Sequence, residues 1–497
     1  MRCLLPIPTS LIRALTIVLV LLMLPLPDWA TCGGGGGGGA GGMSRGGAVG
    51  APGLPLEQET YPVPWRQRKL EDPPLTMGLV VYWFPTGVNE FQRSSLRNSR
   101  TLALYASHCV SMEVADVRSP SGQKFASDAK LPIAVLAQAD GTVIGKAENK
   151  DGFLRVNQVE QLVENEMKRR EETLKAQLKE AKEKEKSGDT QGAIPLYRSV
   201  LEQKCLFPSQ AKNAVKALKK LGVEDVGEIN DGPVFDAAKS AAIERTMRRG
   251  LAAELQANYP EAERWYAKAR RMDPADPAPL RYLGELYRHD IGDWDKAREA
   301  FNEILAMPAD PLSHAVALHG LGKMTVHDGA FKAGLTLMEK SVETYPLPLA
   351  YRNLAVYWNS EGDAAKTDHY VEEALALEPT DPYNLIFAAV FKAASGHSDE
   401  ALNIARKNES LLAASYNLAA IYAQAGQKDK ALALLKRHFF EYERYQAVRS
   451  KEMMEARVDF VFASLREDPV FLALTSGADG RLPLPNGGSP RAQVMNN

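Results

Sequence analysis

The sequence lacks a strong charge of either sign and has few cysteines. It holds 60 Lys and Arg residues against 62 Asp and Glu residues, which gives a net charge of -2. This balance gives no electrostatic sign of nucleic-acid binding. The four cysteines, Cys3, Cys32, Cys109 and Cys205, lie too far apart for a CxxC redox pair or a zinc knuckle. We therefore expect no disulfide framework and no metal site.

Motifs for catalysis and nucleotide binding are also missing. There is no GxSxG elbow, no Walker A loop and no GxGxxG after a strand. The eight histidines form no HExxH or other close metal spacing. His314 and His319 are five residues apart, which on a helix would point their rings about 140° apart. We expect ordinary surface or inter-helix histidines, no cofactor and no enzymatic activity.

An apolar stretch near the start of the chain suggests export. Arg2 and Arg13 precede ALTIVLVLLMLPLP at 14–27, the order of charge and apolar run that a signal peptide has. The run is short and interrupted by prolines, so it makes a poor membrane span. We predict a signal peptide over 1–31 and a mature protein outside the cytoplasm.

Cys32 stands at the end of this segment, before the glycine run 33–39. The arrangement resembles a bacterial lipoprotein junction. That resemblance implies a lipidated Cys32, a disordered glycine-rich tether over 32–74 and attachment to a membrane in the periplasm or at the outer membrane surface. Trp29 and Thr31 depart from the usual lipobox, so a simply secreted form stays open as the alternative.

Residues 77–165 carry the pattern of an α/β domain. The run 78–84, GLVVYWF, is of the kind buried in a central sheet, and a hairpin turn at Asp140-Gly141 separates two later strand candidates. The remaining expected elements are a helix over 90–106, a strand over 109–117, a strand after Leu131-Pro132 and a helix from Val156.

This order of elements resembles the thioredoxin fold, as do the aromatic strand 80–84, the Leu131-Pro132 step and the turn at 139–142. Thioredoxins carry WCxxC just after the first of these strands, whereas residues 86–90 here contain no cysteine. Dithiol chemistry requires a reactive thiolate and a second thiol. We therefore expect a non-catalytic domain with Cys109 as a small buried side chain. A thiol-disulfide oxidoreductase with atypical cysteine usage is the alternative.

The stretch 246–274 sets the pattern of the C-terminal half. Gly250, Ala262, Tyr266, Ala269 and Pro274 have the spacings that define the tetratricopeptide unit, a helix-turn-helix of roughly 34 residues. The stretch resembles that family. Small residues stand where the two helices touch, and the proline ends the second helix.

Similar spacings recur along the chain, and about seven such units would stack into a right-handed superhelix. The fold class we expect is an α/β thioredoxin-like domain followed by an all-α solenoid. After the α/β domain, the predicted parts are a charged linker helix with a first hairpin at 166–220, the repeat array at 234–441, capping helices at 442–475 and a disordered tail at 476–497.

Side chains between the packing positions of the first helices would line the groove of such a superhelix. By analogy with peptide-binding arrays, the candidate contacts are Arg281, Glu285, Arg288, Arg352, Asn353 and Asn417. A solvated helix face is the alternative for each. The sequence thus predicts a scaffold or adaptor of the bacterial envelope that binds a partner protein or peptide. A structural spacer in the envelope is a further alternative.

Overall fold

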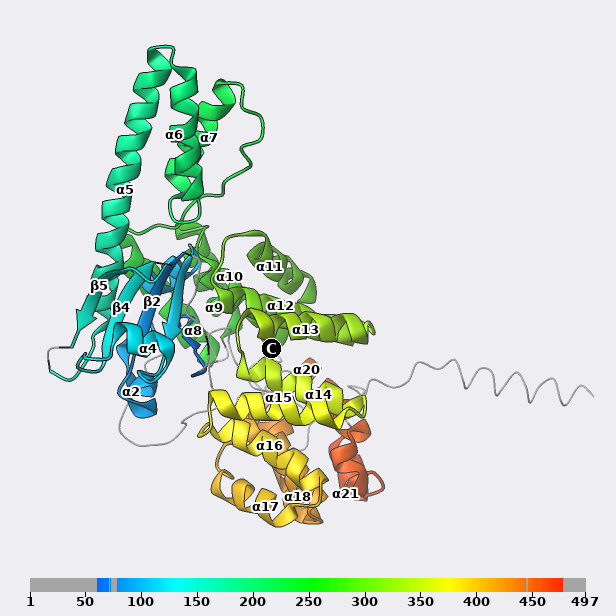
Figure 1. Ribbon diagram of the computed structural model, residues 1–497. Coiled ribbons are helices and arrows are strands. Elements are labelled where there is room, and N and C mark those ends of the chain that lie inside the picture. The colour runs from blue at the N-terminus through cyan, green and yellow to red at the C-terminus, as the bar shows by residue number, and fades with distance from the viewer. Residues whose placement is uncertain are drawn as a thin grey trace, which may run out of the picture.

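The computed structural model describes residues 60–70, 72, 78–138, 140–149, 151–256, 258–443 and 446–476. The predicted signal peptide and Cys32 lie outside these residues, as does all but the first residue of the predicted tail. In the described chain we distinguish an α/β unit, a helical arm and an array of helix pairs (Figure 1). No helix among the described residues combines the length and apolar character needed to cross a membrane.

A mixed sheet forms the centre of the α/β unit. Its described strands follow the spatial order β1-β3-β2-β4-β5. They are β1 (Arg66–Gln67), β2 (Leu79–Phe84), β3 (Val110–Val114), β4 (Ile133–Gln138) and β5 (Val143–Glu148). β3 pairs in parallel with β1 and β2, whereas β4 pairs antiparallel with β2 and β5. All six residues of β2 are buried, because a strand with a neighbour on each side and covered faces is apolar throughout.

Short helices connect these strands. They are α2 (Val88–Arg93), the 3-10 turn η1 (Ser95–Arg97), α3 (Arg100–Ala106) and α4 (Pro120–Phe125). The single helix predicted over 90–106 is therefore wrong. The hydroxyls of Ser94 and Ser99 accept hydrogen bonds from the backbone nitrogens of Leu96 and Leu102, so each serine starts a new helical segment. The peptide bond between Leu131 and Pro132 is cis.

The segment before β2 is ordered, which corrects the predicted tether. Residues 60–70 belong to the fold, and Tyr61, Val63 and Trp65 are at most 3% exposed. The Trp65 ring lies 5.3 Å from that of Trp83 in β2, and its Nε1 donates to the carbonyl oxygen of Leu96. The intervening Pro62 and Pro64 are buried as well, so the segment is covered on both sides.

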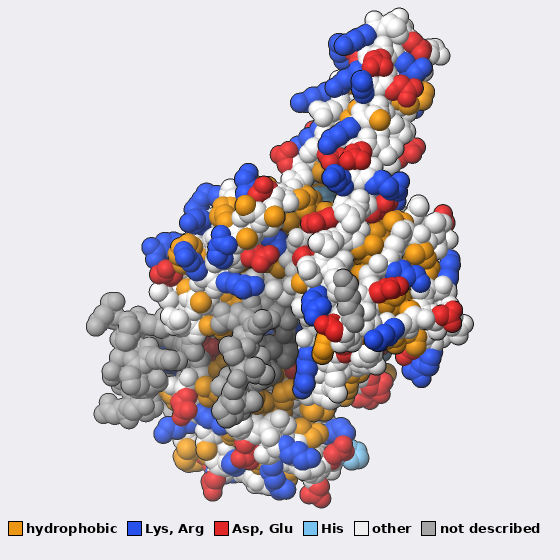
Figure 2. Space-filling model, turned by 90° about the vertical axis from the view of Figure 1, so that its left-hand side faces the viewer, with side chains coloured by type: hydrophobic (Ala, Val, Ile, Leu, Met, Phe, Trp, Pro, Cys, Tyr) orange, Lys and Arg blue, Asp and Glu red, His pale blue; other side chains and the backbone are white. Residues whose placement is uncertain are grey.

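The helical arm projects from the α/β unit (Figure 1). It consists of α5 (Val156–Lys186), α6 (Thr190–Glu202) and α7 (Pro208–Lys220). α5 runs without a break from the sheet to the tip, where Gly188 turns the chain with a φ of 83°. Apolar side chains such as Val163, Leu174 and Tyr197 make one core that continues from the sheet into the arm. Acidic and basic side chains intermingle on the arm surface that faces the viewer in Figure 2.

A disulfide joins the arm to the sheet, contrary to the sequence analysis. Cys109, just before β3, is bonded to Cys205, just after α6, with 5.9 Å between the Cα atoms and a sequence separation of 96. The expectation of a small buried Cys109 is also wrong, because this residue is exposed. The spacing of the cysteines gave no sign of the pair, since α5 and α6 carry the chain out to the arm tip and back.

The array consists of antiparallel helix pairs over residues 237–437. The described pairs are α8 (Ala237–Leu255) with α9 (Tyr259–Met272), α10 (Pro277–Glu285) with α11 (Trp294–Ala306), α12 (Pro311–His327) with α13 (Phe331–Thr344), α14 (Pro348–Ser360) with α15 (Ala364–Leu377), α16 (Pro382–Ala394) with α17 (Ser398–Lys407), and α18 (Ser415–Gln424) with α19 (Lys428–Arg437). A Cβ at Gly250 would collide with the Tyr266 ring, and one at Gly284 with the Phe301 ring. The small residues thus allow the two helices of a pair to approach.

Several first helices of the pairs begin with the same local signal. Asp276, Asp310 and Asp381 each precede a proline and accept a backbone N–H bond of 2.9 Å within the first turn. An aspartate N-cap followed by proline at the first helical position favours helix initiation. The π-helical turn η2 (Leu286–Ile291) extends α10, at the place where this unit has an extra turn residue.

Helical segments after α19 cover the last pair. They are η4 (His438–Tyr442), α20 (Gln446–Val458), η5 (Phe460–Leu465) and α21 (Pro469–Leu474), and the short turn η3 (Leu412–Ala414) precedes α18. Phe439, Phe462 and Phe471 from these segments are fully buried in the core that α18 and α19 share. This end of the array therefore has its apolar face covered, as a solenoid requires.

Candidate binding surface

The first helices of successive pairs lie side by side, and hydrogen bonds between side chains link them. Arg281 Nη1 in α10 donates to Ser313 Oγ in α12 at 3.0 Å. Asn353 Nδ2 in α14 donates to His319 Nε2 in α12 at 2.7 Å. These two bonds, together with one from Arg352 in α14 to Asn384 in α16, make what we call the polar ladder. It joins residues 32 to 34 positions apart, close to the repeat length.

Three of the predicted groove residues are members of this ladder. Arg281, Arg352 and Asn353 were expected to contact a partner, and each instead bonds to the neighbouring repeat. Arg281 and Asn353 are buried, whereas Arg352 is half-buried. The ladder fixes the position of one repeat against the next. The sequence analysis did not name their ladder partners Ser313 and Asn384, and it considered His319 only as a possible metal ligand, although the spacing near the repeat length was a signal.

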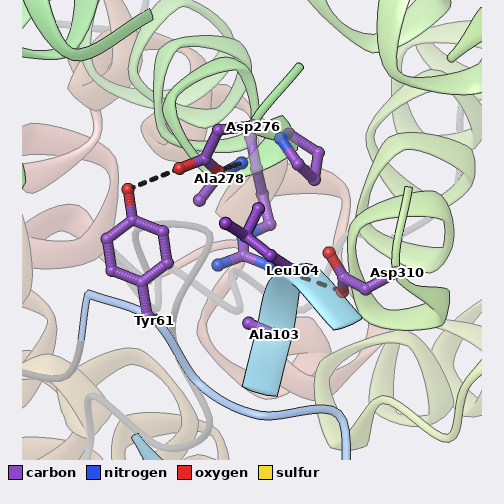
Figure 3. A pocket seen from close by; sticks show the side chains of 8 residues that line it. Tyr61, Ala103, Leu104, Asp276, Ala278 and Asp310 are labelled. Carbon is purple, nitrogen blue, oxygen red and sulfur yellow. Dashed lines mark hydrogen bonds and ion pairs between the residues drawn. The ribbon is translucent and has the colours of Figure 1, made fainter. Parts of the chain in front are cut away.

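Arg281 also lies at the junction of the array and the α/β unit. Its Nη1 is 3.9 Å from Asp310 Oδ1, and both side chains are buried. A cavity of about 10 Å³ adjoins them, with Tyr61 and Leu104 on its other side (Figure 3). Such a volume is roughly the room that one water molecule needs. The cavity is therefore a packing defect between two parts of the chain and is too small for a ligand.

Glu285 at the end of α10 and Arg288 in η2 pair with each other, and both side chains are largely buried. Arg288 Nη2 donates to Glu285 Oε2 at 2.7 Å, and Nε donates to Oε1 at 3.2 Å. Burial alone would lower the pKa of Arg288, but the carboxylate of Glu285 raises it above its ordinary value. The arginine therefore stays charged in a largely buried position.

Cations from three successive units act electrostatically on His319. Its pKa is well below the ordinary value, first because it is buried and then because Arg288, Lys323 and Arg352 act on it. The imidazole is neutral at pH 7 and accepts the hydrogen bond from Asn353. We expected an ordinary surface or inter-helix histidine, and His319 lies between helices and is not on the surface. We call this group of His319 and the three cations the basic site.

Asn417 lies apart from the basic site, in α18 near the end of the array. It is 6% exposed, and its Oδ1 has no hydrogen-bond partner among the described residues. Of the other predicted residues, Glu285 and Arg288 contact each other, whereas Arg281, Arg352 and Asn353 bond to side chains of the neighbouring repeats. The described chain contains no group of three or more His, Cys, Asp or Glu residues that could hold a metal ion.

The α/β unit occupies another surface of the array, along the turns that precede its first helices. Arg100 in α3 is fully buried, and its Nε donates to Asp276 Oδ2 at 3.0 Å and its Nη2 to Asp273. Tyr61 Oη donates to the same oxygen of Asp276 at 2.8 Å. Further along, Arg66 Nη2 donates to the carbonyl oxygen of Thr344 at 2.6 Å. This contact was not predicted, because its two sides lie far apart in sequence.

Comparison with known proteins gives limited matches. No family model matches the chain. A region of 126 residues is 29% identical to the Arabidopsis thaliana protein named "Protein CTR9 homolog", covering 25% of this chain and 12% of that protein. The matched region thus spans only about an eighth of that relative.

Among solved structures, the chain is similar to TTC0263, described as a thermophilic TPR protein from Thermus thermophilus. The match covers 38% of this chain and 99% of that one, at 20% identity and a TM-score of 0.31. The repeats of the present chain themselves show the tetratricopeptide-like pattern. Helix pairs recur at about the tetratricopeptide length, with glycines at the contact between the helices of a pair. The chain is a mostly helical protein with a tetratricopeptide-like array.

Proposed function

We propose that this protein is a scaffold whose array binds an acidic segment of a partner protein at the basic site. The observation that carries the proposal is the meeting of Arg288, Lys323 and Arg352, from three successive units, around a neutral histidine. Glu285 offsets one of these charges through its pair with Arg288, and Asp381 and Glu378 act on Arg352. Cations presented by stacked helices suit a carboxylate-bearing segment, which they attract by charge and orient by hydrogen bonds.

The remaining parts of the proposal concern the α/β unit and location. We propose a non-catalytic thioredoxin-like domain, supported by the strand order and by the absence of cysteine from residues 78–108. We also propose export to the bacterial envelope, with Cys32 as a lipid anchor or with release as a secreted form. The Cys109–Cys205 bond supports export, because disulfides persist mainly in oxidising compartments.

Peptide binding tests the scaffold proposal. A fluorescent peptide rich in glutamate is titrated with the protein, beside the same peptide with glutamine in place of glutamate. We expect the glutamate peptide to bind and the glutamine peptide not to bind, and we expect binding to weaken as salt is added. Lys323→Gln with Arg352→Gln should weaken it by about tenfold, or 1.4 kcal/mol. Arg406→Ala, an exposed position on the second helix α17, is the control and should bind normally.

Two results would count against the basic site. Equal binding of the glutamine peptide would show that charge does not direct recognition. Unchanged binding by the Lys323 and Arg352 variant, when its unfolding curve matches the wild type, would assign the peptide to another surface. The intact mass of the mature chain tests location separately. A chain that starts at an acylated Cys32 supports the anchored form, and an unmodified cleaved chain supports the secreted form.

A further inference from the structure

The Cys109–Cys205 disulfide lies outside the basic site and the contact between α/β unit and array. It ties the residue before β3 to the turn that follows α6. Cys109 is exposed and Cys205 is half-buried. An attacking thiolate has to approach a disulfide sulfur directly, and exposed disulfides are the ones that react most readily. Cys109 is thus the more accessible of the two residues.

The sheet and the arm stay attached without this bond. α5 is a continuous helix of 31 residues that leads from the sheet to the arm tip. The core that runs from the sheet into the arm includes Val163 and Leu174 of α5 and Leu218 of α7. At the far end of the loop after α7, Val234 accepts a hydrogen bond from Arg100. Phe207, in the turn between α6 and α7, is also buried in this core. Reduction therefore leaves the helices of the arm and this turn packed, and removes only the covalent link between Cys109 and Cys205.

The position of Cys109 is also set independently of the disulfide. Val110, the next residue, pairs with Leu79 in the sheet. Cys109 itself has a φ of 62°, and a Cβ at Gly78 would lie 2.8 Å from its carbonyl oxygen. The glycine thus permits the close approach that places Cys109 here. A reduced Cys109 remains at this position, where the bond to Cys205 can form again.

We propose that the Cys109–Cys205 bond is a reversible thiol-disulfide exchange site that a dithiol reduces. One thiolate of the dithiol attacks Sγ of Cys109, forms a mixed disulfide and releases Cys205 as a thiolate, which takes up a proton. The second thiolate then attacks the sulfur of the dithiol in the mixed disulfide and releases Cys109, which also becomes a thiol. Two electrons pass to the protein, and the dithiol becomes a disulfide.

Alkylation of the native chain tests this proposal. Cys3→Ser with Cys32→Ser leaves the pair as the only cysteines. The folded protein is treated in separate arms with dithiothreitol and with a purified protein dithiol oxidoreductase, and free thiols are alkylated without denaturant. We expect both cysteines to be labelled at a rate at least about tenfold above that of global unfolding, with unchanged far-ultraviolet circular dichroism. Removal of the reductant should restore the bond.

The outcomes separate the sources of reductant. Reduction by dithiothreitol alone assigns the site to small thiols, and reduction in both arms assigns it to protein dithiols as well. Labelling only at the rate of unfolding would overturn the proposal, because the bond would then be a static crosslink. A dithiol oxidoreductase whose second cysteine is replaced by serine traps the mixed disulfide, and mass spectrometry of the trapped complex identifies the attacked residue. A mixed disulfide on Cys205 in place of Cys109 would overturn the assignment of Cys109.

Discussion

Arg100 of α3 and Asp276 before α10 form an ion pair that is closed off from solvent, with 3.0 Å between Nε and Oδ2. Asp273 contacts the same guanidinium, and Ser240 accepts a further hydrogen bond from it at 2.5 Å. One arginine of the α/β unit thus serves two carboxylates of the array. A buried charge that loses its partner is costly, so this contact determines how firmly the two parts are joined.

Arg100→Ala should lower the free energy of unfolding by roughly 3–5 kcal/mol, because it leaves Asp273 and Asp276 buried without their cation. Urea unfolding measured by fluorescence checks this value. Arg118→Ala is the control, because Arg118 also forms an ion pair with an aspartate, Asp116, but its side chain is 75% exposed. We expect a loss below about 1 kcal/mol there. Similar losses in both variants would mean that the buried network does not hold the parts together.

Removal of the disulfide should destabilise the protein without unfolding it. Cys109→Ser with Cys205→Ser opens a loop whose ends are 96 positions apart, and closure of a loop of this length contributes about 4.7 kcal/mol through the entropy of the unfolded chain. Denaturant unfolding under oxidising conditions measures the loss. Cys3→Ser with Cys32→Ser should have no such effect. Equal stability of the two double variants would show that the crosslink does not restrict the unfolded chain.

The sequence predicted the parts of this fold that depend on local patterns. β2 was recognisable because all its residues are apolar, and the first helix pair was recognisable from Gly250 and Tyr266 at the repeat spacing. The disulfide was not recognisable, since pairing cannot be deduced from isolated cysteines. Tyr61 was taken for part of a tether because its partner Asp276 lies 215 residues away.

In the candidate site, too, the sequence predicted the local repeat pattern but not the contacts between repeats. The repeat spacing predicted that the candidate residues lie on successive first helices, because equivalent positions recur with the repeat. It could not tell which of them bond to the next repeat. Arg281 has the character of a ligand-binding residue in the sequence, yet Ser313 and Asp310 take up its guanidinium in the structure. Such pairing depends on how far one helix is shifted along the next.

Gly284→Ala should destabilise the array. The added Cβ would collide with the ring of Phe301, which is fully buried and has little room to move. Overpacking of this kind typically costs about 1–3 kcal/mol. Thermal or urea unfolding measures the effect, and Gly87→Ala is the matched control, since its Cβ would meet no atom of the described residues within 4 Å. An equal loss in both variants would point to a general effect of losing glycine.

Glu113 should make stability depend on pH. Burial raises the pKa of this β3 carboxyl to about 7, although Arg68 and Arg66 act in the opposite direction. The pKa of Glu113 is higher in the folded protein than the ordinary value of 4.5 that it has in the unfolded chain. The free energy of unfolding is therefore highest below about pH 4.5, where the carboxyl is neutral in both states. It falls as the pH rises through about 7, where the buried carboxyl loses its proton. A shift of this size corresponds to about 2.5 kcal/mol between pH 5 and pH 8. Asp72, a further charge near Glu113, also raises the pKa of this carboxyl.

Glu113→Gln removes the titrating group and keeps the shape of the side chain. We expect the variant to resemble the wild type at pH 5 and to be more stable than it at pH 8, as measured by urea unfolding at the two pH values. Glu148→Gln, at an exposed position of the edge strand β5, should leave the difference between the two pH values unchanged. If Glu113→Gln is instead less stable than the wild type at pH 8, the ion pair with Arg68 outweighs the burial of the carboxylate, and the raised pKa is contradicted.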